Sequence, residues 1–153
     1  MVDENIILRK LSELEAYTSQ IQDFRSISVD DYKNDWKSQR IIERTLQMMV
    51  ESCVDIAGHI ISDKKYRIPE SYADAFIVLR ENGIVDNKIC RTMEQIAKFR
   101  NVIVHHYDRV DAEIVVGILR NRLKDFDKYK NAIVNWLKNN SHRHTQTTTD
   151  RSK

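Results

Sequence analysis

Four side chains that can act on a charged substrate lie close together between residues 100 and 107: Arg100, Asn101, His105 and Tyr107. A guanidinium presents a planar, permanently charged fork that fits a phosphate group in a bidentate manner. An imidazole is available in both protonation states near neutrality, so it can accept or donate a proton. This combination is suited to acid–base chemistry at a phosphate group.

Arg100 occupies a position where an arginine needs a partner. Apolar residues recur around it at helical spacing, at Ile89, Met93, Ile96 and Ile103, and Arg100 falls in the same register. A charged group in such a seam is costly unless it is paired or lines a cleft. Two interpretations stay open: Arg100 faces a functional cleft, or it forms a structural ion pair with a polar stripe on an earlier helix, made of Glu43, Gln47, Glu51, Asp55 and His59.

The spacing of Arg100 and His105 favours a site shared between two copies of the chain. At about 100° per residue, the two side chains point about 140° apart on an ideal helix, so one helix directs them poorly at a common target. Two such helices related by a two-fold axis would bring two arginines and two histidines to one cleft. The sequence therefore predicts a homodimer with a composite site, in which His106 is a helix-end residue and not a second catalyst.

Periodic apolar residues predict that an all-α, up-down antiparallel bundle of five to six helices carries these side chains. The strongest pattern places Ile42, Leu46, Met49, Cys53, Ile56 and Ile60 at steps of four and three, so the helix over 37–62 is expected at the centre. Pro69 suits the first turn of a helix that Gly83 ends in a left-handed conformation. The other expected helices are 3–21, a short one with Tyr32 and Trp36, 86–103, and 111–137.

The composition argues against several classes of protein. Three Gly and one Pro in 153 residues are too few for a turn-rich sandwich or barrel. The sequence shows no apolar run of membrane-spanning length and no secretory signal, and its two separated cysteines suit a reducing compartment, so we expect a cytoplasmic protein without membrane contacts. No cofactor or metal is expected, because no HExxH motif or cysteine pair completes a site and no glycine-rich phosphate loop is present.

The net charge of +2 says little about partners. The polar stretch 139–153 carries Arg143, Arg151 and Lys153 against Asp150, which leaves the remaining residues neutral. A strongly basic face would indicate nucleic-acid binding by itself, and this composition does not show one. We expect one helical domain over 1–138 and a disordered polar tail over 139–153.

The stretch Arg100-Asn101-Val102-Ile103-Val104-His105-His106-Tyr107 resembles the signature of the HEPN superfamily, and specifically of its HepT-like branch. The likeness extends from about Arg40 to Leu137. It includes the segments ERTLQMMVESCVDIAGHIIS and IPESYADAFIVLRENGIV and the YDRVD turn after the motif.

This resemblance implies a dimeric helical bundle that acts as a metal-independent endoribonuclease toxin, encoded beside an MNT-type nucleotidyltransferase antitoxin. It implies that Arg100 and His105 are the catalytic pair and that Asn101 is the polar residue accompanying the arginine. Tyr107 is implied as a tyrosine that the antitoxin can modify with AMP, and a bulky anion there would block RNA by charge and volume. We expect Glu51 and Asp55 to support Arg100 from the polar stripe.

A second class of function remains open from the sequence. In it, the chain is a non-catalytic dimeric helical partner of a nucleotidyltransferase, and Arg100 and His105 bind a nucleotide or nucleic acid or hold the bundle together. Tyr107 would then pack at the helix end. Substitutions that abolish activity without lowering stability would separate the two classes.

Overall fold

The computed structural model describes residues 3–151, apart from the side chains of Tyr107 and of residues 141–151. This part of the chain is all-α, as predicted, and contains no strand. Its α-helices are α1 (Glu4–Ile21), α2 (Val29–Asn34), α3 (Trp36–Lys64), α4 (Tyr72–Glu81), α5 (Asn87–His105), α6 (Ala112–Asn121) and α7 (Leu123–Arg151). Two short 3-10 helices, η1 (Gln22–Phe24) and η2 (Tyr107–Arg109), lie between them.

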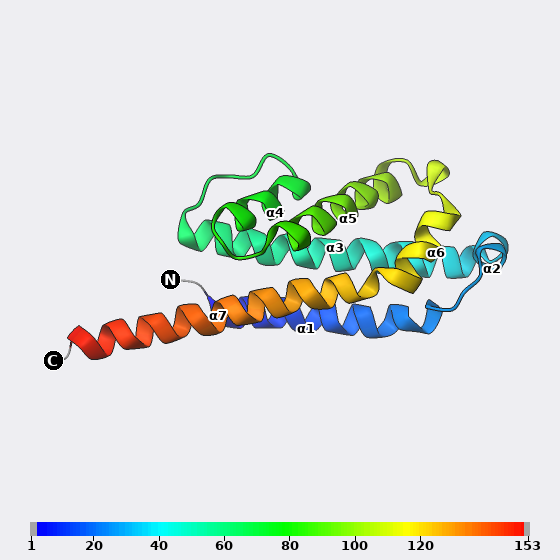
Figure 1. The fold of residues 1–153 in the computed structure, drawn as a ribbon. Helices are drawn as coiled ribbons and strands as arrows, with labels where there is room; N and C mark the ends of the chain where they lie inside the picture. Colours follow the sequence, from blue (N-terminus) through cyan, green and yellow to red (C-terminus); the bar gives the residue numbers. More distant parts are fainter. Residues whose placement is uncertain (1–2, 152–153) are drawn as a thin grey trace.

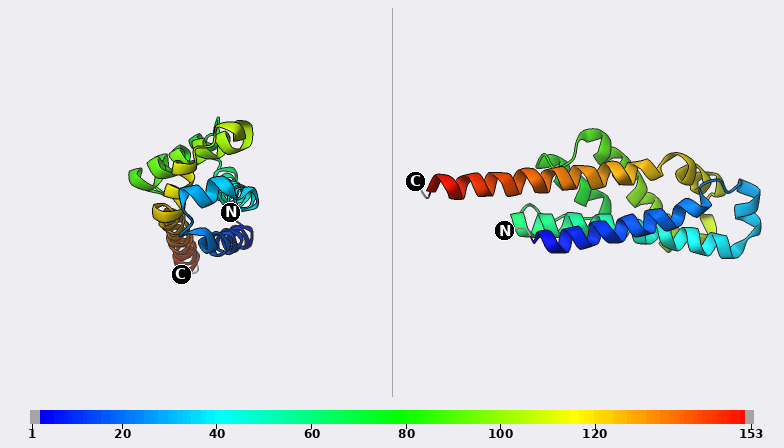
Figure 2. Two further views of the ribbon diagram at one scale, coloured as in Figure 1. Left: turned by 90° about the vertical axis from the view of Figure 1, so that its right-hand side faces the viewer. Right: turned by 90° about the horizontal axis from the view of Figure 1, so that it is seen from below.

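Helix α3 is the central element of the bundle. Helices α1 and α7 run along one side of it, and the α4–α5 hairpin packs against its other side (Figures 1 and 2). The short helices α2 and α6 contact each other at one end of the bundle. Helix α5 runs antiparallel to α3, so its C-terminal end lies over the N-terminal half of α3 (Figure 1).

The core confirms the predicted central stripe of α3. All six residues of that stripe are buried, from Ile42 through Cys53 to Ile60. Tyr129 of α7 is also buried, and its hydroxyl donates to the carbonyl oxygen of Cys53 at 2.8 Å, which satisfies a polar group in an apolar setting. The same ring meets Phe76 of α4 edge to face, with centroids 5.5 Å apart. Tyr129 therefore joins α7 and α4 across α3.

Side-chain caps define most of the helix starts. Asp86 accepts a hydrogen bond from the Ile89 N–H at the start of α5, and Asp35 caps α3 in the same manner. Ser71 caps α4, so this helix begins after Pro69, which was wrongly predicted in its first turn. At the other end of α4, Gly83 has φ 73°, in the left-handed region as predicted.

The described part of the chain has seven α-helices and not the five to six expected, because one predicted helix is broken in two; a second predicted boundary is displaced by one residue. Trp36 does not share a short helix with Tyr32; the Asp35 cap ends α2 and starts α3 between them. The predicted helix 111–137 is broken at Arg122 into α6 and α7. Buried apolar residues continue at helical spacing on both sides of Arg122, so the periodicity carried no sign of this break.

Helix α7 continues to Arg151, past the predicted domain end at residue 138. The side chains of 141–151 lie outside the described residues, so the division into a domain over 1–138 and a tail over 139–153 stays a prediction. Between residues 3 and 151, no helix is both long and apolar enough to cross a bilayer.

Candidate active site

Arg100 lies in the C-terminal half of α5 and turns toward α3. Its side chain is only 12% exposed. Nη2 donates to Oε1 of Glu51 on α3 at 2.5 Å. The polar stripe predicted to face Arg100 therefore reaches it at Glu51.

Three further contacts fix the orientation of this ion pair. Nη1 of Arg100 donates to the side-chain oxygen of Asn101 at 3.2 Å, and the guanidinium carbon lies 4.6 Å from the centroid of the Tyr72 ring. The amide of Gln47 donates to Glu51 at 3.1 Å from one turn earlier on α3. Groups from α3, α4 and α5 thus hold one guanidinium, and such a preorganised charge can stabilise an anionic transition state.

The guanidinium of Arg100 has more donors than the protein has acceptors for it. An arginine carries five N–H donors, and Glu51 and Asn101 are the acceptors bonded to it within the described part of the chain. Its Nε is buried without a hydrogen-bond partner there. A donor left unpaired in a buried position is unfavourable. Nη1 and Nη2 each carry a second N–H that has no acceptor among the described residues, and these are the donors that an anionic ligand can use.

The carboxyl group of Glu51 is held in its charged form. Partial burial favours the neutral acid, but hydrogen bonds from Arg100 and Gln47, together with the charges of Arg100 and Arg44, outweigh it and lower the pKa of Glu51. The pair accordingly stays ionised at neutral pH.

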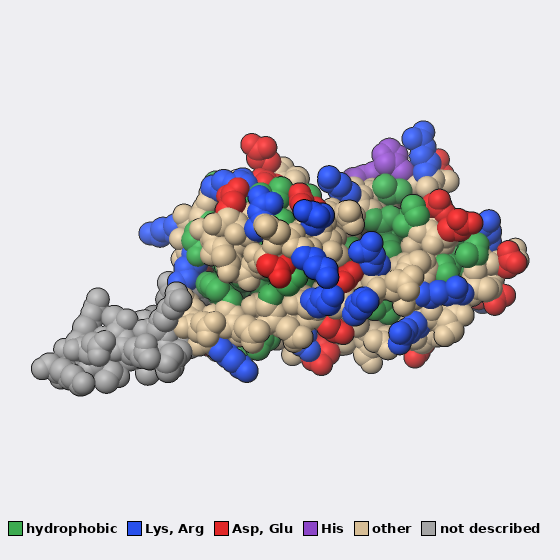
Figure 3. All heavy atoms as spheres, in the orientation of Figure 1, with side chains coloured by type: hydrophobic (Ala, Val, Ile, Leu, Met, Phe, Trp, Pro, Cys, Tyr) green, Lys and Arg blue, Asp and Glu red, His purple; other side chains and the backbone are tan. Residues whose placement is uncertain are grey.

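His105 lies in the last turn of α5, and its side chain is exposed. The helix ends at His105, and the next residue, His106, caps it by donating its N–H to the carbonyl oxygen of Val102 at 2.8 Å before the chain enters η2. Histidine side chains are visible at the surface above this end of α5 (Figure 3). Within the described residues, His105 makes no direct hydrogen bond to Arg100. Arg100 is turned inward and His105 outward, as their spacing predicts.

The remaining predicted residues fall into different places. Asp55 lies on α3 but pairs with Lys10 of α1 at 3.6 Å rather than with Arg100. Tyr107 starts η2, and its side chain lies outside the described residues. The contact of Tyr72 with Arg100 was not predicted, because nothing in the sequence pairs the two residues.

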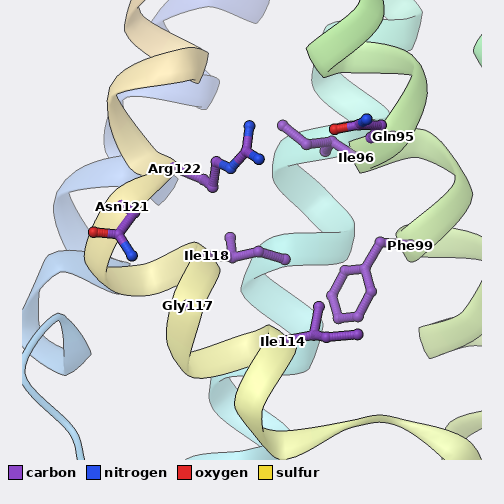
Figure 4. Close-up of a pocket in the computed structure, with 8 residues that line it drawn as sticks. All are labelled: Gln95, Ile96, Phe99, Ile114, Gly117, Ile118, Asn121 and Arg122. Atoms are coloured by element: carbon purple, nitrogen blue, oxygen red, sulfur yellow. The ribbon is translucent and has the colours of Figure 1, made fainter.

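A groove of about 320 Å³ lies on another side of α5, between α5 and α6 (Figure 4). Its wall is mostly apolar and contains neither Arg100 nor His105; it is lined by Gln95, Ile96, Phe99, Ile114, Gly117, Ile118, Asn121 and Arg122. Within the described residues, no group of three or more His, Cys, Asp or Glu side chains is arranged to hold a metal ion.

Comparison with known proteins identifies relatives over most of the chain. The family model described as "Ribonuclease HepT-like" matches residues 14–133. The mRNA nuclease HepT of Shewanella oneidensis is 28% identical over 129 residues, which are 84% of this chain and 96% of the relative. The tRNA nuclease HepT of Aphanizomenon flos-aquae is 29% identical over 136 residues, 89% of this chain and 92% of that protein.

Solved structures show the same fold. The tri-AMPylated HEPN toxin of Shewanella oneidensis, in complex with MNT antitoxin, matches with a TM-score of 0.78 and 28% identity, over 87% of this chain and 98% of that one. A toxin–antitoxin structure with AMP-PNP also gives 0.78 and 28%, over 87% and 99%. YutE from Bacillus subtilis, at 18% identity and a TM-score of 0.77, shares the fold over 91% and 93%. On the family match over residues 14–133, and as residues 100–107 predicted, the chain belongs to the ribonuclease HepT-like family.

Proposed function

We propose that this chain is a metal-independent endoribonuclease toxin whose catalytic residues are Arg100 and His105. Its family and its nuclease relatives support ribonuclease activity. The observation that carries the assignment of residues is the Arg100 guanidinium, which is held by three helices, keeps an N–H on each of Nη1 and Nη2 that no described residue uses, and lies five residues before the exposed His105 on α5. RNA cleavage without a metal needs a positive charge that is oriented toward the phosphate and a side chain that transfers protons, and an arginine and a histidine supply these two functions.

The proposed reaction uses the 2′-hydroxyl of the RNA as nucleophile. A base removes the 2′-hydroxyl proton, and the 2′-oxygen bonds to the adjacent phosphorus. The bond from phosphorus to the 5′-oxygen then breaks, and an acid protonates that oxygen. The products are a 2′,3′-cyclic phosphate and a 5′-hydroxyl. His105 supplies proton transfer, and Arg100 stabilises the charge on the phosphorane oxygens.

Asn101 and Glu51 act in this proposal as positioning residues. Both bond the guanidinium of Arg100, so they fix the direction in which its free N–H groups point. Asp55 is left outside the proposed site because it pairs with Lys10 instead.

The inward Arg100 and the outward His105 support a composite site in a homodimer. One chain directs the two side chains apart, whereas a two-fold axis near the end of α5 would bring both pairs to one cleft. In such a cleft, one His105 serves as base and the other as acid. A mixed dimer of wild type and His105→Ala would then lose nearly all cleavage, and a mixed dimer that keeps half of it would contradict shared histidines.

The antitoxin in this proposal is an MNT-type nucleotidyltransferase that transfers AMP to Tyr107. A related toxin is AMPylated and bound to an MNT antitoxin, which supports the partner and the modification. Incubation with the antitoxin and ATP should add adenylyl groups to the wild type and not to Tyr107→Phe, as measured by mass spectrometry. On this proposal the chain acts in the cytoplasm, where its RNA substrates are found.

The test of the catalytic residues is cleavage of end-labelled RNA in excess EDTA by wild type, Arg100→Ala and His105→Ala. We expect cutting by the wild type alone, with melting temperatures measured for all three. A folded, unmodified wild type that leaves every RNA intact would contradict the proposal.

The Arg100–Glu51 ion pair also favours a second candidate, a non-catalytic dimeric partner of a nucleotidyltransferase that binds a nucleotide or nucleic acid. In that case Arg100 serves the bundle, and Arg100→Ala lowers stability while the wild type itself cuts no RNA. The same three proteins therefore separate the two candidates.

A further inference from the structure

The N-terminal half of α3 exposes aromatic and basic side chains where a helix surface is usually mixed and polar. Trp36 is 64% exposed, which is unusual for so large an apolar residue. Arg40 and Arg44 follow at steps of four, and both are exposed. On an ideal helix the three side chains fall within about 80° of one another. We call these three residues the α3 stripe.

The α3 stripe leads directly to the Arg100 cluster. Gln47 and Glu51 continue the same face of α3, and Glu51 binds Arg100. Because α5 is antiparallel to α3 (Figure 1), the direction from Glu51 to Arg44 is also the direction from Arg100 to His105. Arg44 is seven residues from Glu51, which is about 10 Å along the axis of α3. His105 is five residues from Arg100, which is about 7.5 Å along the axis of α5. Arg44 therefore lies at about the level of His105.

The positive charges of Arg40 and Arg44 are largely left for a ligand to bind, because few acids in the described part of the protein neutralise them. Arg44 has no ion pair or hydrogen bond among the described residues, and its charge reaches Glu51, whose pKa it helps to lower. Arg40 pairs with Glu43 at 3.5 Å, but that carboxylate also accepts from the Tyr32 hydroxyl at 2.9 Å. Asp35, the acid that directly precedes Trp36, is engaged as the cap of α3.

We infer that the α3 stripe binds a single-stranded segment of RNA next to the bond that is cut, with a base stacked on Trp36 and phosphates held by Arg40 and Arg44. This inference rests on the proposed function. Exposed aromatic rings beside arginines are the features with which proteins bind unpaired strands, because every base has a face for stacking and every nucleotide a phosphate.

RNA fits this surface better than a second copy of the chain. A two-fold interface centred on the stripe would set Arg40 and Arg44 against their own copies, and like charges oppose such a contact. A polyanion meets these charges with the opposite sign. The stripe also continues along α3 to Glu51, which binds Arg100, the residue proposed to hold the scissile phosphate. An RNA strand bound at Arg100 must continue over the protein surface on at least one side of the cut bond, and the stripe lies on such a path.

The test measures binding separately from cleavage. In a His105→Ala background, fluorescence anisotropy with a short fluorescein-labelled single-stranded RNA of mixed sequence gives Kd over a range of salt. We expect Trp36→Ala to weaken binding about five-fold or more. Arg44→Ala should weaken it and reduce the slope of log K against log salt by about 0.7. The matched controls are Leu8→Ala, an exposed apolar residue, and Arg9→Ala, both on α1 across α3 from the site.

Two results would overturn the inference. One is an unchanged Kd in both stripe variants. The other is weaker binding accompanied by a smaller mass in sedimentation, which would assign the stripe to an interface between copies. Binding can be measured even if the wild type cuts no RNA, so failure of this inference is distinguishable from failure of the proposed function. Melting temperatures confirm that these surface variants are folded.

Discussion

Two arginines of this chain are bound to carboxylates in opposite ways. Arg67, before α4, is 43% exposed and makes four hydrogen bonds of 2.8 to 3.0 Å, two to Asp74 and two to Glu81. Arg100 is 12% exposed, binds one carboxylate, and keeps a buried Nε without an acceptor in the described part of the chain. The exposed arginine is saturated by the protein, whereas the buried one is not.

This difference separates a structural arginine from one available to a ligand. The bonds of Arg67 tie the loop after α3 to both ends of α4, and they leave few donors over. The contacts of Arg100 fix the plane of the guanidinium but leave donors free, which is the state in which a fork can receive a phosphate. The number of unused donors distinguishes the two better than the presence of a salt bridge does.

Lysine replacements give the largest expected contrast. Arg100→Lys keeps the charge but removes the fork, so we expect kcat/KM for RNA cleavage to fall by about 100-fold or more. Arg67→Lys should leave cleavage unchanged, because that side chain serves only the loop. Cleavage rates of the two variants, measured side by side, test this. Equal losses in both variants would remove the distinction between the two arginines.

Removal of Glu51 should affect both stability and activity. Glu51→Ala leaves the buried charge of Arg100 without its carboxylate, and we expect a loss of about 2 kcal/mol in the free energy of unfolding. Glu51→Gln keeps an acceptor for the guanidinium and should lose less. Urea denaturation of the three proteins measures the effect. Equal stability of wild type and Glu51→Ala would show that the pair does not hold Arg100.

The Tyr72 ring provides a smaller effect on the same guanidinium. A partly exposed cation–π contact contributes about 0.5 to 1 kcal/mol. Tyr72→Leu should therefore reduce cleavage by about two- to five-fold, while Tyr72→Phe, which keeps the ring, should behave as the wild type. If Tyr72→Phe loses as much as Tyr72→Leu, the hydroxyl and not the ring is what matters.

The smallest expected effect is the loss of fold stability in acid that comes from the ion pair between Arg67 and Asp74. The Arg67 side chain and the Glu70 N–H hold the pKa of Asp74 down to about 2. A carboxyl with a lowered pKa stabilises the fold above its unfolded pKa of about 4, and this contribution is lost as the pH falls toward 2. Asp74→Asn should be less stable than the wild type at neutral pH, and the two stability curves should converge between pH 4 and 2. Curves that stay parallel would contradict the shift.

The sequence was most informative where one helix face was long and regular. The spacing from Ile42 to Ile60 identified the central helix and its buried side, and the signature from Arg100 to Tyr107 identified the family. Arg100 in an apolar register also pointed correctly to a partner on the polar stripe of α3. These features are local in sequence, so a single chain reveals them.

The parts that the sequence could not provide depend on contacts between distant segments. The break at Arg122 interrupts an apolar pattern that continues on both sides of it. Asp55 and Glu51 look equivalent in the stripe, but packing gives one to Lys10 and the other to Arg100. The contact between Tyr72 and Arg100 joins two helices whose sequences carry no mark of it.

The central claim is that this chain cuts RNA through the 2′-hydroxyl without a metal. The most direct measurement is cleavage, in excess EDTA, of an end-labelled RNA and of the same RNA with a single 2′-deoxy nucleotide at the cut position. We expect the wild type to leave 2′,3′-cyclic phosphate and 5′-hydroxyl ends and to spare the substituted position. Cutting at the deoxy nucleotide, or ends with a 3′-hydroxyl and a 5′-phosphate, would contradict the claim.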